Sequence, residues 1–144
     1  MGAKEFRDLF GRNFSITRQA GKRYEALRRE PFFAGMDSKH IFMLALALAF
    51  EKKLERKKIE RYPLLNTNSF TDQDLWLIAS VAVEETGNLN ILDDANEMKH
   101  IAEEYAMAGL PEVERLVAED TTDNLTLRLN KLGLEGLSSA KRPG

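Results

Sequence analysis

Few side chains in this sequence have the types and spacing that catalysis or metal binding needs. The chain has no cysteine and only two histidines. His100, Glu103 and Glu104 form an H-x-x-E-E run, and His/Glu pairs at i and i+3 bind metal ions in some helical proteins. Glu84 and Glu85 could approach this run from the preceding predicted helix. One hypothesis is therefore a metal-dependent hydrolase centred on His100 and Glu103.

A solvated acidic helix face explains the same run better. Ile101, Ala102 and Tyr105 define the inward face of the predicted helix, which leaves His100 and Glu103 outside it. A helical dimetal site also needs the motif twice, together with two further carboxylates. Gly-rich phosphate loops and a G-x-S-x-G motif are absent from the sequence. We therefore predict that the protein is not an enzyme and binds no metal and no cofactor.

The charge of the chain is divided between its two halves. Residues 1–62 carry 15 Lys/Arg and 8 Asp/Glu, whereas residues 63–144 carry 6 and 15. The balances are +7 and −9, and together they give the formal net charge of −2. Such a division favours binding of a polyanion or an acidic partner by the basic half. Neutralisation of one half by the other, within a monomer or across a dimer, is the alternative.

One binding architecture matches the order of elements near the N-terminus. Residues 13–18 alternate polar and apolar side chains, which is the period of a half-buried strand. A basic helix over 20–30, a turn through Gly35 and a capped apolar helix from residue 38 would follow. This is the order of a ribbon-helix-helix unit, in which two chains pair their strands into a ribbon that enters the major groove. A helix through 13–18 in an ordinary helical bundle is equally compatible with the pattern.

The ribbon hypothesis assigns roles to individual residues and predicts a homodimer. Phe14 and Ile16 would lie in the core, while Asn13, Ser15 and Thr17 would face bases. Arginines beside the strand and the first amides of the next helix would contact phosphates. The candidate nucleic-acid-binding residues are Arg12, Asn13, Ser15, Thr17, Arg18, Arg23, Lys39, Lys52 and Lys53.

The expected fold is mainly α, a compact multi-helix domain around a buried central helix over about 38–58. Ile41 to Phe50 is apolar all round, as in a buried helix, and Asp37 or Ser38 would cap its start. The basic segment Lys52 to Arg61 would continue this helix into solvent until Pro63. This extension is a second candidate DNA surface, although its interspersed glutamates also permit self-neutralisation by i, i+4 ion pairs.

Further helices are predicted in the second half of the chain. Thr71 and Asp74 resemble a capping box, and Gly87 would end that helix. Another helix would begin after Asp93 or Asp94 and end at Gly109, followed by short helices from Pro111 and around Leu125 to Gly133. We expect one domain over 1–133 and a frayed, disordered tail over 134–144.

A membrane location is not expected. The first thirty residues lack the apolar region of a secretory signal, and the longest apolar run, Ile41 to Phe50, is ten residues long. That is about half the length of a membrane-spanning helix. The sequence therefore predicts a cytoplasmic protein.

Several segments resemble a known family. They are Asp37 to Ala45, Ser69-Phe70, Val83 to Gly87, and Ile101 to Ala106 followed by Gly109. The chain resembles, over about residues 12–118, the fourth class of small proteins associated with bacterial and archaeal DNA phosphorothioation (Dnd) systems. Members of that family tend to have a glycine where the central helix leaves the core, and this chain has Phe50-Glu51 there. The resemblance implies an association with DNA modification or restriction machinery, without an activity to transfer.

Two functional hypotheses follow. The first is a non-enzymatic accessory protein that binds DNA or a DNA-processing protein, as a homodimer. The alternative is a protein–protein adaptor without nucleic-acid contact, which would dock through its acidic helices or through the apolar turn at Phe32-Phe33.

Overall fold

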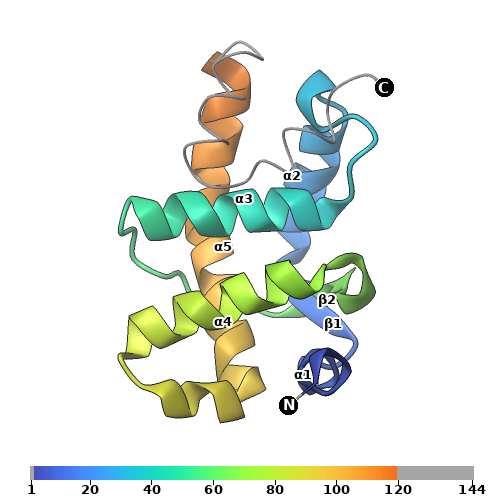
Figure 1. Cartoon of the computed structure of the whole chain (residues 1–144). Helices are drawn as coiled ribbons and strands as arrows, with labels where there is room; N and C mark the ends of the chain where they lie inside the picture. Colours follow the sequence, from blue (N-terminus) through green and yellow to red (C-terminus); the bar gives the residue numbers. More distant parts are fainter. Residues whose placement is uncertain (1, 120–144) are drawn as a thin grey trace.

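Two helices that cross at close range form the centre of the fold. The computed structural model describes residues 2–119, and α3 (Ser38–Glu51) lies across α5 (Ala95–Glu119) there (Figure 1). A Cβ atom on Gly109 of α5 would lie 1.9 Å from the carbonyl oxygen of Ala45 in α3. Only a glycine therefore permits this contact. The fold is mainly helical, as the sequence predicts, and it contains one small two-stranded sheet.

The remaining elements pack around this crossing. Helix α4 crosses α5 below α3 in the same view, and the N-terminal elements lie to one side (Figure 1). No helix within residues 2–119 is long and apolar enough to cross a membrane. The other elements are α1 (Ala3–Leu9), β1 (Asn13–Ile16), α2 (Arg18–Arg28), β2 (Tyr62–Asn66), α4 (Asp72–Thr86) and the short 3-10 turns η1 (Pro31–Phe33), η2 (Thr67–Ser69) and η3 (Leu89–Asp93).

A cluster of four phenylalanine rings joins the N-terminal elements to the core. Phe14 of β1 lies 4.6 Å from Phe70 and 5.7 Å from Phe42 of α3, measured between ring centroids. Phe10, the residue after α1, lies 5.8 Å from Phe14. All four side chains are buried. Aromatic pairs at such distances contribute beyond the area they bury, so the cluster fixes β1 against α3.

The strand at residues 13–16 is confirmed, but its predicted partner is wrong. It pairs antiparallel with β2 of the same chain, with Asn13 opposite Asn66 and Phe14 opposite Leu65. A ribbon-helix-helix unit would need this edge for the strand of a second chain. The homodimer was expected because β1 would pair with the same strand of a second chain, and the structure does not provide that pairing. Sequence patterning missed β2 because Pro63 lies inside it, and proline is tolerated there only because a two-stranded sheet has edge strands alone.

The central helix ends earlier than predicted, at Glu51 rather than about 58. Lys53 adopts a left-handed conformation with φ of 55° and turns the chain out of the helix. The segment 52–61 then runs without helical structure along α5, where the amide of Lys57 donates to the carbonyl of Glu104. In this path Lys52, Arg56 and Arg61 pair with carboxylates of α4 and α5 instead of with glutamates of their own segment.

The final described helix is longer than predicted. Gly109 and Pro111 were expected to separate two helices, yet α5 continues through both to Glu119. Packing against α3 overrides the local preference of these residues, since Gly109 serves the helix crossing rather than a helix end. The capping box at Thr71 and Asp74 and the left-handed end at Gly87 are confirmed. The helix expected at Leu125 to Gly133 and the tail over 134–144 lie outside the described residues.

Candidate nucleic-acid interface

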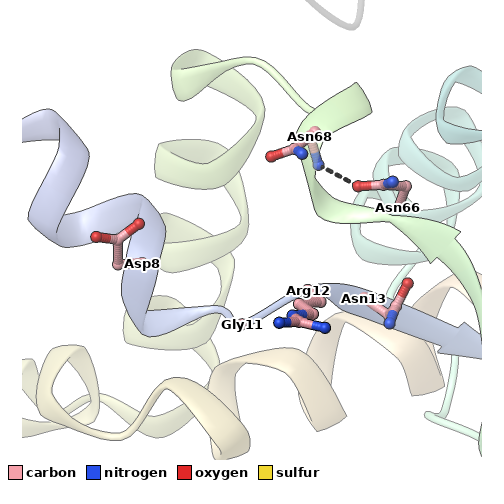
Figure 2. Close-up of a pocket in the computed structure, with 6 residues that line it drawn as sticks. All are labelled: Asp8, Gly11, Arg12, Asn13, Asn66 and Asn68. Atoms are coloured by element: carbon pink, nitrogen blue, oxygen red, sulfur yellow. Dashed lines mark hydrogen bonds between the residues drawn. The ribbon is translucent and has the colours of Figure 1, made fainter.

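Arg12 and Asn13, at the start of β1, border a polar hollow. The hollow has a volume of about 510 Å³ and lies between the end of α1 and the turn after β2. Figure 2 shows Arg12 and Asn13 on one side and Asn66 and Asn68 on the other. Both predicted residues therefore reach a solvent-accessible site, which they share with two asparagines that sequence reasoning missed.

Ser15 does not face a ligand, contrary to the ribbon hypothesis. Its residue exposure is 6%, and its amide donates a 2.8 Å hydrogen bond to Oε2 of Glu103. Glu103 itself was expected outside the core, but its side chain is fully buried. Arg61 donates to both of its oxygens, at 2.6 and 3.1 Å. The carboxylate was misplaced because its partners come from segments 42 and 88 residues away.

This pairing also bears on the metal hypothesis. Glu103 is occupied by Arg61 and the Ser15 amide, and the carboxylate that His100 approaches is that of Glu97, at 4.0 Å. Within the described part of the chain, no group of three metal-ligating side chains comes together. His100 and Glu103 therefore do not form the metal-binding pair that this hypothesis requires. Hydrogen bonding to Glu103 raises the pKa of Arg61 above its usual value.

Thr17 and Arg18 have local roles at the start of α2. The hydroxyl of Thr17 caps the helix by accepting a hydrogen bond from the amide of Ala20 at 2.9 Å. The guanidinium of exposed Arg18 lies 4.2 Å from the ring centroid of Tyr62, in a cation–π contact. Thr17 is thus committed to the helix cap, while Arg18 keeps its charge at the surface.

Three of the predicted cations are held in ion pairs. Arg23 pairs with Glu114 through two hydrogen bonds, which raise the pKa of its guanidinium. Lys39 is buried and pairs with Asp74 at 2.5 Å. Lys52 pairs with Glu112 at 3.2 Å, and Lys53 is exposed at the turn after α3. The nine candidates therefore do not form one surface.

A different set of cations does share a surface. Arg18, Lys22 and Arg29 recur at helical spacing along the exposed side of α2 and the residue that follows it, with Arg28 beside them. None of the four has an ion pair within residues 2–119. We call Arg18, Lys22, Arg28 and Arg29 the basic face.

Two neighbouring hollows lie along the basic face. The first, of about 320 Å³, is bordered by Arg18, Lys22 and Arg28 and by Leu64 of β2. The second, of about 370 Å³, is bordered by Arg28 and Arg29. Glu25 and Arg28 border both hollows, so the two hollows form one continuous trough along the exposed side of α2. Sequence reasoning named only Arg18 of this set, although the i, i+4 and i+11 spacing was readable.

The N-terminus of α3 lies next to this trough. Ser38, its first residue, borders the first hollow, and Asp37 borders the second without capping the helix through its side chain. Burial, together with the charge of Lys39, lowers the pKa of His40 below its usual 6.5. His40 therefore adds less positive charge here near neutral pH than a free imidazole would.

Comparison with known proteins supplies one match. The family model described as DNA sulphur modification system-associated protein 4 matches residues 25–141. No curated protein and no solved structure matches the chain with significance.

Proposed function

Because the chain belongs to the DNA sulphur modification system-associated protein 4 family, we propose that it is a non-enzymatic accessory protein that binds the DNA backbone through the basic face of α2. The ribbon hypothesis assigned DNA binding to β1, but this strand pairs with β2 of the same chain, and its Ser15 is buried. The proposal keeps DNA as the ligand and assigns it to cations that the fold leaves without carboxylate partners.

The observation that carries the proposal is the contrast in pairing among the cations. Arg23, Lys39 and Lys52 each hold a carboxylate, whereas the four cations of the basic face hold none. Arg18 lies in the first turn of α2, where the positive end of the helix dipole disfavours a cation. Arg18 contacts the ring of Tyr62, and at the positive end of the helix its charge remains available to an anion.

The dimensions of the basic face suit a DNA backbone. Arg18 and Arg29 are eleven residues apart, which is about 16 Å along a helix. That length corresponds to roughly five base-pair steps of 3.4 Å. Four cations along this distance can contact phosphates on either side of one groove. Such contacts provide affinity and orientation, without reading the base sequence.

The acidic second half would orient the molecule on DNA. The described residues 63–119 carry 2 Lys/Arg and 12 Asp/Glu, so their carboxylates repel phosphates while the basic face attracts them. Ion pairs with α5 neutralise Lys52, Arg56 and Arg61 of segment 52–61, which are cations outside the basic face. Together these charges favour one docking orientation.

The test is a charge reversal with a matched control. Lys22→Glu with Arg29→Glu reverses two cations of the basic face, and Lys57→Glu with Lys58→Glu makes the same change in net charge on exposed lysines of segment 52–61. Binding of a fluorescent 20-base-pair duplex is measured by anisotropy over a salt series. We expect the first variant to lose affinity and to reduce the salt slope by about 0.9 for each lost phosphate contact.

Two results would overturn the proposal. One is an absence of binding by the unaltered protein at low salt, because phosphate contacts are strongest there. The other is equal loss of affinity in both double variants, because net charge and not the basic face would then determine binding.

A second candidate function, the protein–protein adaptor, is favoured by a different surface. The predicted docking turn is wrong, since Phe32 and Phe33 are buried. Trp76 of α4 is instead 46% exposed and stacks on Phe6 at 3.8 Å, with Leu77 37% exposed beside it. Exposed aromatic side chains are enriched in protein interfaces. If proteins of the modification system co-elute with the unaltered chain but not with Trp76→Ser, the adaptor function is supported; equal co-elution would refute it.

A further inference from the structure

The polar hollow at the start of β1 differs in chemistry from the trough along α2. It is lined by Asp8, Gly11, Arg12, Asn13, Asn66 and Asn68 (Figure 2). One cation and one anion balance its charge, so it has no net attraction for phosphate. Three carboxamides remain, and each offers both a donor and an acceptor. Its volume, about 510 Å³, lies within the range of small-molecule sites.

Much of the hydrogen-bonding capacity in this hollow is unused. Among residues 2–119, no protein group bonds to the side-chain amide of Asn13 or Asn68. Asn66 uses its carbonyl oxygen to accept from the amide of Asn68 at 2.8 Å, which holds the turn after β2 and leaves its NH2 group available (Figure 2). The free donors and acceptors therefore come from three points on two facing segments.

The hollow and the basic face belong to one side of the molecule. Alternation along β2 places Leu64 and Asn66 on the same, outward side of the ribbon, and both are exposed. Leu64 borders the first hollow of the basic face, and Asn66 borders the polar hollow. Asn13 and Arg18 are five residues apart, about 17 Å if extended. A strand whose phosphates contact the basic face can therefore reach the polar hollow.

Resting on the proposed DNA binding, we propose that the polar hollow receives an unpaired nucleobase and binds its edge through Asn13, Asn66 and Asn68. A nucleobase is neutral and carries adjacent donors and acceptors, which a carboxamide matches in pairs. The base edges of a duplex lie at the bottom of its grooves, where a concave protein site cannot enclose them. A base turned out of the stack can enter such a site. Gly11, with φ of 68°, lines the hollow without adding a side chain to it.

The test uses chemical changes in the DNA, which cannot unfold the protein. Three 20-base-pair duplexes carry at their centre one unpaired adenosine, one unpaired abasic site, or one unpaired unsubstituted purine, which retains the ring and lacks the amino donor. We expect the adenosine duplex to bind at least about fivefold more tightly than the other two, the lower end for one bidentate contact.

Variants then assign the preference to the hollow. Asn13→Ala with Asn68→Ala should abolish the preference for adenosine and leave binding of the abasic duplex unchanged. Asn90→Ala, an exposed asparagine of η3, is the matched control and should retain the preference. Unaltered circular dichroism verifies the fold of each variant.

The outcomes separate this inference from the proposed function. Equal binding of all three duplexes by the unaltered protein would overturn the nucleobase site, while sensitivity to Lys22→Glu with Arg29→Glu would still support backbone binding. A preference that survives Asn13→Ala with Asn68→Ala, or disappears in Asn90→Ala, would also overturn the site. Failure to bind any duplex would remove the proposed function and the nucleobase site together.

Discussion

Segment 52–61 and the basic face of α2 look alike in sequence and differ in structure. Both are rich in lysine and arginine, yet Lys52, Arg56 and Arg61 of the segment pair with carboxylates of α4 and α5. Its other cations, the exposed Lys53, Lys57 and Lys58, have no ion pair within residues 2–119. The cations of the basic face have no carboxylate partner within residues 2–119, although Glu25 lies among them. The difference teaches that a run of cations indicates a binding surface only where the fold leaves its charges unneutralised.

The largest expected effect concerns the buried carboxylate of the paired region. Glu103→Ala would leave Arg61 and the buried amide of Ser15 without an acceptor, and should lower the free energy of unfolding by about 3 to 5 kcal/mol. Urea denaturation measures it. Glu114→Gln, at the half-exposed pair with Arg23, should cost less than about 1 kcal/mol. Equal losses of unfolding free energy in the two variants would contradict the expected difference between a buried and a half-exposed ion pair.

The next effect concerns the crossing that positions α5 for those pairs. Gly109→Ala would place a methyl group against the Ala45 carbonyl, and should destabilise the protein by about 2 to 3 kcal/mol. If the space were free, alanine would instead stabilise the helix by about 1 kcal/mol. The sign of the change in thermal unfolding therefore decides whether the helices really meet at this residue.

The basic face should tolerate substitution much better. Lys22→Ala with Arg29→Ala removes two exposed side chains without ion pairs, so the free energy of unfolding should change by no more than about 0.5 kcal/mol. Denaturation and DNA binding are measured on the same sample. A large loss of stability would mean that these residues serve the fold, and the comparison between the two regions would fail.

The smallest expected effect is a pH dependence at the start of α3. Because burial lowers the pKa of His40, the unfolded chain takes up a proton near pH 6.5 before the folded chain does. The contribution of His40 is therefore fully present above pH 6.5 and is lost as the pH falls towards the folded pKa. The stability difference between the unaltered protein and His40→Gln should change in this window, as measured by denaturation from pH 7.5 to 5. A constant difference would contradict the burial of the imidazole.

Much of the fold was predictable because it depends on local signals. The apolar run from Ile41, the capping box at Thr71 and the glycine end at Gly87 each act within a few residues, and all three were interpreted correctly. The alternation at 13–16 also identified a strand. These features follow from propensity, capping and periodicity alone.

The errors have a common cause, which is the influence of distant partners. Gly109 looked like a helix end because its contact with Ala45 cannot be read from neighbouring residues. Glu103 looked exposed because Arg61 and Ser15 arrive from far along the chain. The strand at 13–16 was assigned to a second chain because Pro63 concealed its partner in β2.

The candidate site was less predictable than the fold. Of the nine predicted residues, Arg12 and Asn13 lie in the polar hollow and Arg18 lies on the basic face, whereas Ser15 is buried. Lys22 and Arg29 were missed because sequence alone does not show which cations find carboxylates. A surface is defined by what remains unpaired after folding, and that is a property of the whole molecule.

The position of α5 near the end of the described chain also constrains how the protein folds. Three of its hydrogen-bonded contacts, with Ser15, Phe10 and Arg23, span 88, 89 and 91 residues. The N-terminal strand and helices cannot complete their interactions until α5 has been synthesised. Contacts of such long range slow folding, because the chain must be closed into a large loop before they form. Folding on the ribosome therefore waits for the last described helix, and until then the apolar surface of α3 that packs against α5 stays uncovered.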